Sequence, residues 1–189
     1  MEAVIESIRQ FIALSEDEVL VIRDLFDTRQ LKAGEHFLEE GKVCRHVGFI
    51  NHGLVRYYVN DEGQEKTIYF NQEGEFICYY PSFLPQKPSI VSIQALEDTE
   101  LAVISYDGLQ TLYARVSGGE RFGRLAIEQV FLTSGEQLRS LYTDPPTARY
   151  LQFVAAYPGL VQRLPQYYIA SYVGIKPQSL SRIRRRLAQ

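Results

Sequence analysis

The chain has 189 residues, an apolar fraction of 46% and a formal net charge of −3. This length fits one large domain or two small ones, and the apolar fraction is sufficient for a buried core. The apolar runs are too short to span a bilayer, and acidic residues interrupt the N-terminal pattern, which argues against a secretory signal. We therefore expect a cytoplasmic protein without a membrane partner.

The cysteines and histidines argue against several kinds of redox and metal site. Cys44 and Cys78 are too few for a disulfide framework or for an iron–sulfur cluster, so we expect two partly buried free thiols. His36, His46 and His52 lack the close His-x-His spacing of a cupin metal site, and they form no recognisable pair with a cysteine for haem. The sequence thus predicts no metal, no cofactor and no catalytic residue.

Charge divides the sequence into two unlike parts. Residues 144–189 hold seven Lys or Arg residues and one acid, Asp144, for a net charge of +6. Residues 1–143 carry a net charge of −9. Such asymmetry indicates two modules with different partners, and nucleic acid is the leading partner for the basic one.

The first residues of the chain predict two helices. Apolar residues recur at helical spacing over residues 3–27. Glu18 follows Ser15 by three residues, which predicts a capping box at the start of the second helix.

Residues 28–105 have the pattern of short β-strands. Apolar stretches alternate with turn residues, and YYVNDEGQEKTIYF predicts a hairpin closed around Asp61-Glu62-Gly63. Short strands separated by regular turns predict an antiparallel sandwich or jelly roll. The turn glycines are Gly34, Gly41, Gly53, Gly63 and Gly74.

Helical patterns return at Tyr106. Asp107 is placed to cap a short helix, and residues 120–143 predict a long helix that ends before Pro145. The apolar residues of the long helix cover more than one face, so we expect one face to pack on the β domain and another on a second subunit. The alternative is a helix that is simply buried inside a monomer.

The basic part predicts three more helices. TARYLQFVAAYPGL reads as a helix with Leu151, Val154 and Ala155 facing inward. Another helix opens at Pro165, and the last one begins near Pro177, because proline is well tolerated in a first turn.

The last two helices have the features of a helix-turn-helix. Ala170 is the small residue where the helices cross, and Gly174, four residues later, permits a positive φ in the turn. Leu180, Ile183 and Leu187 form an apolar stripe that would seal the second helix against the first.

The opposite face of the last helix is polar and cationic. Gln and Arg side chains can pair with adenine and guanine edges in the major groove, and the first residues of such a helix reach the bases. Cations further along contact phosphates. The alternative is a solvated basic helix. We predict that Gln178, Ser179 and Arg182 read bases and that Lys176, Arg185 and Arg186 contact phosphates.

The order of these parts resembles the Crp/Fnr family of bacterial transcription regulators. LKAGEHFLEEGK and LEDTELAVIS are similar to the strands and glycine turns of a cyclic nucleotide-binding domain. The resemblance implies an α+β fold with a β jelly-roll domain and N-terminal helices over residues 1–116. A central dimerisation helix over 117–143 and a helix-turn-helix domain over 144–189 would follow. The short C-terminus is similar to family members with a reduced or absent wing.

The resemblance also implies a pocket for a small-molecule effector. Members that bind cyclic AMP place a glutamate and an arginine after a Gly-Asp/Glu-Phe turn, since a buried phosphate needs a cationic partner. Here the turn is Gly74-Glu75-Phe76, but Tyr79 or Tyr80 replaces the acid and Pro88 replaces the arginine. We therefore expect no tight binding of cyclic AMP.

Several residues remain candidates for the effector pocket. Lys87 is one residue from the arginine position and lacks its planar fork. Thr133-Ser134 match the pair that contacts the base in cyclic-AMP receptors. Aromatic side chains are expected to fill the pocket unless it takes an unknown, less charged ligand. The candidates are Gly74, Glu75, Tyr79, Tyr80, Lys87, Ser89, Thr133 and Ser134.

These observations favour a homodimeric, sequence-specific regulator whose partner is double-stranded DNA. RNA polymerase is a further partner that the resemblance implies. The first alternative is a ligand-binding or protein-interaction module whose helix-turn-helix binds no DNA, which a weak salt dependence of DNA binding would reveal. The second is a cupin-type enzyme, and the histidine spacing argues against it.

Overall fold

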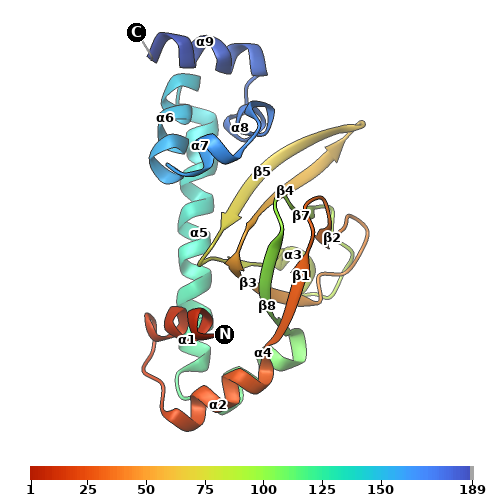
Figure 1. Ribbon diagram of the computed structural model, residues 1–189, viewed down its shortest axis with the longest axis vertical. Coiled ribbons are helices and arrows are strands. Elements are labelled where there is room, and N and C mark those ends of the chain that lie inside the picture. Colours follow the sequence, from red (N-terminus) through yellow and green to blue (C-terminus); the bar gives the residue numbers. More distant parts are fainter. Residues whose placement is uncertain (188–189) are drawn as a thin grey trace. The chain divides into compact units, whose positions relative to one another are not determined.

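The computed structural model describes residues 1–187 of the chain (Figure 1). Contacts divide the chain into two compact units, Met1–Val59 with Tyr69–Glu128, and Asn60–Ile68 with Gln129–Gln189. Residues 188 and 189, at the end of the predicted helix-turn-helix domain, lie outside the described residues. Helices and antiparallel sheets together make an α+β fold, as the sequence predicts.

Two four-stranded sheets form a β-roll (Figure 1). The strand order is β1-β8-β3-β6 in one sheet and β2-β7-β4-β5 in the other. The pairs β1–β8, β3–β8, β3–β6, β2–β7 and β4–β7 are antiparallel, which confirms the predicted jelly roll. The strands are β1 (Asp27–Leu31), β2 (His36–Leu38), β3 (His46–His52), β4 (Leu54–Asp61), β5 (Gln64–Gln72), β6 (Phe76–Ile77), β7 (Ser92–Ala95) and β8 (Thr99–Ser105).

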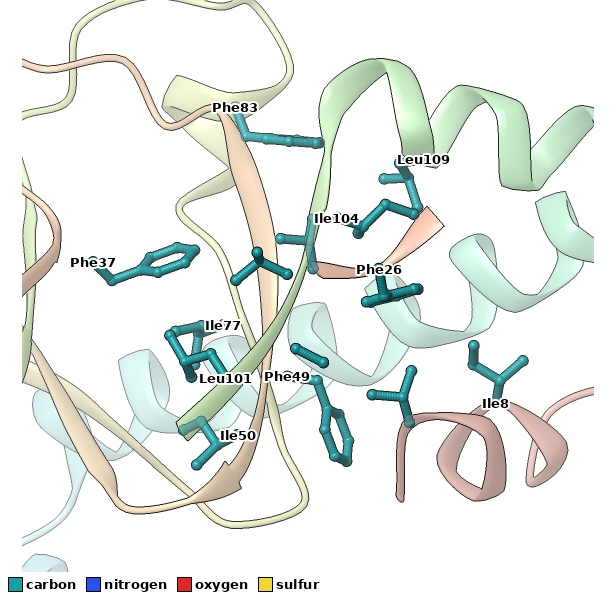
Figure 2. Close-up of a cluster of buried hydrophobic side chains, with 14 of the residues drawn as sticks. Ile8, Phe26, Phe37, Phe49, Ile50, Ile77, Phe83, Leu101, Ile104 and Leu109 are labelled. Atoms are coloured by element: carbon teal, nitrogen blue, oxygen red, sulfur yellow. The ribbon is translucent and has the colours of Figure 1, made fainter. Parts of the chain in front are cut away.

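The core of the first unit lies on both faces of β8 (Figure 2). Four consecutive residues of β8, from Leu101 to Ile104, are buried, so both faces of the strand are covered. Ile8 and Leu109 of the helices and Phe37 of β2 belong to the same apolar cluster. The helices of this unit are α1 (Glu2–Arg9), α2 (Glu16–Leu25), α3 (Tyr80–Phe83) and α4 (Tyr106–Arg115).

Two helix starts show how well local signals predict caps. The capping box at α2 is confirmed, with Ser15 Oγ accepting from Glu18 N at 3.3 Å and Glu18 Oε2 accepting from Ser15 N at 2.8 Å. The prediction of Asp107 as the cap of α4 is wrong. Ser105 Oγ caps this helix by accepting from Gly108 N at 3.0 Å, which leaves Asp107 inside the first turn.

The turns of the β-roll depend on backbone conformations with positive φ. All five predicted turn glycines have positive φ. In the hairpin between β4 and β5, Glu62 and Gly63 have φ values of 53° and 84°, as a two-residue primed turn requires. At Gly53 a Cβ atom would lie 2.7 Å from the Cα of Thr99, so no larger residue fits without a shift.

The second unit is mainly helical. Its boundary with the first unit falls within α5 (Gly119–Thr143). The prediction that Leu151, Val154 and Ala155 face inward on α6 is wrong for Leu151 and Ala155, which are exposed, while Val154 is half-buried. The aromatic residues Tyr150 and Phe153 occupy the buried face. The remaining helices are α6 (Pro146–Ala156), α7 (Leu160–Arg163), α8 (Gln166–Val173) and α9 (Pro177–Leu187).

Candidate nucleic-acid interface and effector segment

The turn between α8 and α9 is built around a glycine. Gly174 adopts a left-handed conformation with φ 70° and ψ 41°, which costs a glycine little and most other residues more. Ile175 N donates to Ala170 O at 2.9 Å and closes the end of α8. Ala170 is completely buried, and α8 contacts α9. These features confirm the predicted helix-turn-helix.

The apolar face of α9 holds it on the neighbouring helices. Leu180 is completely buried and Ile183 is 4% exposed. Leu187 is 48% exposed, so the prediction that it also faces inward is wrong. The first two turns of α9 make the buried contact, and Leu187 lies in the third. Pro177 is the first residue of the helix, as predicted.

The other face of α9 is exposed and cationic. Five Lys or Arg residues and no acid lie between Lys176 and Arg186. Ser179 is half-buried, which places it at the flank of this face. The structure thus places the six predicted DNA-contacting residues on α9 and on Lys176, the residue just before it. The exposed members are Lys176, Gln178, Arg182, Arg185 and Arg186.

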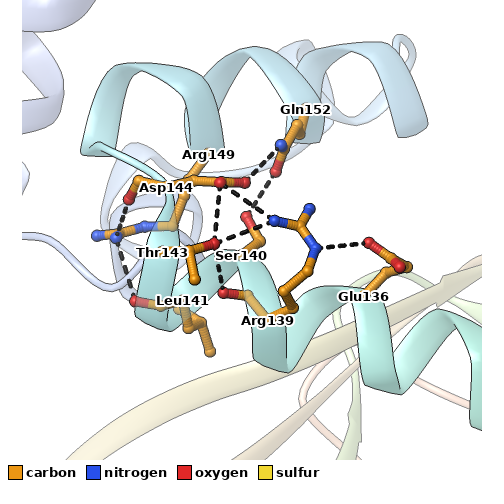
Figure 3. A network of polar contacts seen from close by, with 8 residues as sticks. All are labelled: Glu136, Arg139, Ser140, Leu141, Thr143, Asp144, Arg149 and Gln152. Carbon is orange, nitrogen blue, oxygen red and sulfur yellow. Dashed lines mark hydrogen bonds and ion pairs between the residues drawn. The ribbon is translucent and has the colours of Figure 1, made fainter.

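Arg149 connects three chain segments at the base of the helix-turn-helix, and Figure 3 shows its contacts with Leu141 and Asp144. Its Nε donates to Val173 O at 2.7 Å, at the end of α8, and its Nη1 donates to Asp144 O at 2.9 Å, just after α5. Longer contacts of 3.4 Å reach Leu141 O and Gly174 O. A guanidinium suits this place because it supplies several donors in a fixed plane. Sequence reasoning missed this role, since only the folded chain brings these carbonyls together.

The Asp144 side chain completes the same polar network (Figure 3). Its carboxylate accepts from Gln152 Nε2 at 2.8 Å, from Thr143 Oγ1 at 3.1 Å and from Arg139 Nη1 at 3.3 Å. Hydrogen bonds from Gln152, Ser140 and Thr143, with the charge of Arg139, lower the pKa of Asp144 to about 2. The junction between α5 and α6 is therefore a set of mutually satisfied polar groups.

A cavity of about 280 Å³ lies beside this network. It is lined by the end of α5 and by α6 and α8, with Thr133, Gln137 and Tyr157 among the lining residues. Thr133, a predicted effector-pocket residue, therefore faces a cavity of the second unit. Both Thr133 and its neighbour Ser134 are exposed.

In the first unit, two polar side chains of the predicted effector segment, residues 74–89, are bound by their own neighbours. The Glu75 carboxylate accepts from Asn71 Nδ2 at 2.8 Å and from Gln72 N at 2.9 Å. Ser89 is buried, and its hydroxyl both donates to Val91 O and accepts from Val91 N. These contacts stabilise the turns themselves and leave little capacity for a ligand.

The other predicted residues of the segment differ in exposure. Gly74 and Lys87 are exposed, whereas Tyr79 and Tyr80 are half-buried. Burial raises the pKa of both tyrosines, so both phenols are neutral at neutral pH. Tyr80 packs edge-to-face on Phe83 at 6.2 Å between ring centroids. Residues 74–95 contain no arginine.

The sequence of residues 28–116 matches the cyclic nucleotide-binding domain family. Residues 28–116 are therefore similar to a cyclic nucleotide-binding domain, the name used for this part of the chain. No curated protein matches the sequence.

Solved structures with the same fold include bacterial regulators. FixK2 from Bradyrhizobium japonicum is 15% identical, with 86% of this chain and 84% of that chain covered and a TM-score of 0.74. The c-di-GMP responsive regulator CLP from Xanthomonas campestris is 17% identical, with 92% of both chains covered and a TM-score of 0.70. A Crp/Fnr family structure from Eubacterium rectale is 19% identical, with 93% and 84% covered and a TM-score of 0.70. The chain therefore has the fold of the Crp/Fnr regulators, as the sequence predicts.

The cyclic nucleotide-binding domain also contains a buried arginine that sequence reasoning missed. Arg56 of β4 is 2% exposed. Its Nε and Nη2 donate to Gln94 Oε1 at 2.9 and 2.6 Å, and the guanidinium lies 4.2 Å from the centre of the Tyr58 ring. Its neighbours Val55 and Tyr57 belong to the core, so Arg56 points to the opposite face of the sheet. The alternation along β4 could have indicated that face, but not its burial.

The α5 helix exposes a continuous apolar stripe. Ile127, Phe131 and Leu138 are 36%, 76% and 56% exposed, and Leu141 and Tyr142 extend the same side. At about 100° per residue these positions fall within roughly one quarter to one third of the helix circumference. Exposed apolar surface of this kind is typical of a surface that another protein covers.

The described part of the chain carries neither a metal-ligand cluster nor a membrane-spanning helix. Residues 1–187 contain no group of three or more His, Cys, Asp or Glu side chains placed to hold a metal ion. None of the helices in that range is long and apolar enough to cross a bilayer.

Proposed function

We propose that the protein is a homodimeric, sequence-specific DNA-binding transcription regulator of the Crp/Fnr type that acts in the cytoplasm. The observation that carries the proposal is the exposed cationic face of α9, held in place by buried Leu180 and Ile183. A helix fixed in this way can enter the major groove with its polar side chains toward the bases. The regulator fold of the similar solved structures supports the proposal.

Within α9, we assign two kinds of DNA contact. Gln178 and Arg182 are exposed in the first two turns, where recognition helices reach base edges. Ser179 is half-buried and has the shortest side chain of the three predicted base readers. We assign the phosphate contacts to Lys176, Arg185 and Arg186, which would add affinity but no sequence specificity.

The apolar stripe on α5 is the proposed dimer interface. Ile127, Phe131, Leu138 and Leu141 follow a spacing of four, seven and three residues, close to the pattern of a two-helix seam. Ser134 lies in the same stripe, between Phe131 and Leu138. Two-fold symmetry about such a seam predicts two half-sites on the DNA about 34 Å apart.

The substitution Phe131→Glu tests the dimer. A charge in the middle of the stripe is expected to convert the dimer to a monomer and to weaken binding of a full operator at least tenfold. The matched control is Leu132→Glu, since Leu132 is 61% exposed but lies roughly 130° around the helix from the centre of the stripe. Sedimentation velocity measures both variants, and a dimer that survives Phe131→Glu would contradict the proposed interface.

We assign regulation to the cyclic nucleotide-binding domain without assigning cyclic AMP as the effector. The segment after Gly74 contains no arginine, and Glu75 and Ser89 are bound by neighbouring groups of the chain. The candidate pocket residues remain Gly74, Glu75, Tyr79, Tyr80, Lys87 and Ser89 in one unit, and Thr133 and Ser134 in the other. The proposed modules are residues 1–116, 117–143 and 144–189.

DNA binding is tested by selecting bound sequences from a random duplex library with the full chain. Fluorescence anisotropy at 50 and 200 mM salt then compares a selected duplex with a random one. Because several cations contact phosphates, DNA binding should be at least a hundredfold weaker at the higher salt concentration. No enrichment together with a flat salt response would favour the alternative of a ligand-binding or protein-interaction module.

A further inference from the structure

Cys44 and Cys78 come together inside the cyclic nucleotide-binding domain. They are the two cysteines of the chain and lie 34 residues apart in the sequence, yet their Sγ atoms are 4.0 Å apart. Cys44 is buried, and Cys78 is half-buried. Sequence reasoning treated them as two separate thiols, whereas the fold makes them a pair.

Hydrogen bonds hold the backbone of each cysteine in place. Cys44 N donates to Ser82 Oγ at 2.9 Å, and that hydroxyl in turn donates to Lys87 O at 2.5 Å. Cys78 N donates to Tyr57 Oη at 3.1 Å. A disulfide bond is about 2.05 Å long, so each sulfur needs to move by only about 1 Å. The thiols are therefore preorganised for contact with each other.

The surroundings give the two thiols different chemistry. A hydrogen bond from the Cys78 thiol lowers the pKa of Cys44 to about 7. Burial raises the pKa of Cys78. Near neutral pH the thiolate form of Cys44 is therefore favoured, while Cys78 keeps its proton.

We propose that Cys44 and Cys78 form a redox-active dithiol that a small hydroperoxide, such as hydrogen peroxide, oxidises to an intramolecular disulfide. The Cys44 thiolate attacks one peroxide oxygen, the O–O bond breaks, and Cys44 becomes a sulfenic acid while the departing hydroxide takes up a proton to give water. The Cys78 sulfur then attacks Cys44 Sγ, and its proton leaves with the sulfenic oxygen as a second water. Two thiols thus lose two electrons to one peroxide.

The location of the pair restricts both its oxidant and its effect. Cys44 is 2% exposed, so the oxidant has to be small. Cys78 lies between β6 and α3, and Cys44 lies just before β3. The disulfide would therefore fix the entrance to α3, in the segment where the effector residues are predicted, whether or not the protein binds DNA.

The test uses the reduced full-length protein with excess hydrogen peroxide and no DNA. Both thiols should disappear, the intact mass should fall by the two hydrogens of one disulfide, and peptide mapping should join Cys44 to Cys78 within one chain. Dithiothreitol should restore both thiols. Two free thiols after peroxide treatment of the folded protein, or disulfides formed only between chains, would overturn the proposal.

The order of reaction is tested with single substitutions and with pH. In Cys78→Ser, dimedone should trap a sulfenic acid at Cys44, whereas Cys44→Ser should react at least tenfold more slowly with peroxide. In the unmodified chain, the rate should rise about tenfold between pH 6 and pH 8, with a midpoint near 7. A midpoint near the ordinary thiol value of about 8.5 would contradict the lowered pKa of Cys44, and a Cys44→Ser variant that reacts as fast as the unmodified chain would contradict Cys44 as the nucleophile. Circular dichroism checks that both variants are folded.

Discussion

Two polar segments of the chain use their hydrogen-bonding groups in opposite ways. In residues 74–91 of the cyclic nucleotide-binding domain, Glu75 and Ser89 are satisfied by groups within a few residues of themselves. On α9, the charged and amide groups of Gln178, Arg182 and Arg185 lie exposed to solvent. Segments of similar polarity therefore differ in whether they can still bind a partner.

The difference arises from local packing rather than from composition. Short turns let a side chain reach its own backbone, and the effector segment is built from such turns. An α-helix already satisfies its backbone internally, so the side chains of α9 are free to point outward while Leu180 and Ile183 hold the other face. A recognition surface thus depends on the buried side of the same helix.

The largest effect is expected from truncating a buried side chain of α9, because these side chains hold the exposed face in position. Leu180→Ala removes a completely buried side chain and should lower the free energy of unfolding by about 2–5 kcal/mol. The matched control is Leu187→Ala on the same helix, where the side chain is 48% exposed and the loss should stay within about 1 kcal/mol. Urea unfolding followed by circular dichroism measures both. Equal losses would show that Leu180 does not anchor the helix.

A second pair of substitutions, at Arg149, tests whether the planar guanidinium or only its positive charge stabilises the helix-turn-helix. Arg149→Met removes the donors to Val173 O and Asp144 O and should cost about 1.5–3 kcal/mol in stability. Arg149→Lys keeps the charge without the planar fork and should recover only part of that loss. Thermal unfolding gives the stabilities. Full recovery in the lysine variant would show that charge alone matters at this position.

The smallest expected effect concerns the effector segment of the cyclic nucleotide-binding domain. Isothermal titration with cyclic AMP and with cyclic GMP should give no binding at micromolar concentrations, because no arginine is placed in residues 74–95 for a cyclic phosphate. Micromolar binding of either nucleotide would show that the segment opens for a ligand, and the comparison between the two segments would then fail.

Much of the fold could be predicted because its signals are local. The capping box at Ser15, the positive-φ turn glycines and the proline start of α9 each depend on a few neighbouring residues. The two faces of α9 could be predicted from helical periodicity, except at Leu187, where the buried contact has already ended.

The errors come from features that depend on the assembled chain. The aliphatic residues of α6 predict the wrong buried face, because aromatic packing of Phe153 with Tyr157 and Tyr172 decides which side is buried. The carbonyls that Arg149 joins and the contact between Cys44 and Cys78 are distant in sequence. No local pattern contains such pairings, so only the structure reveals them.

The central claim is that the exposed face of α9 reads DNA sequence, and Arg182→Ala tests it most directly. Anisotropy with a selected duplex and with a random duplex should show a loss of about 1–3 kcal/mol on the selected DNA and a much smaller loss on the random DNA. Arg121→Ala, an exposed arginine on α5 outside the helix-turn-helix, should leave both affinities unchanged. An equal loss of affinity for both duplexes in Arg182→Ala, or no loss for either, would contradict the assignment of Arg182 as a base reader.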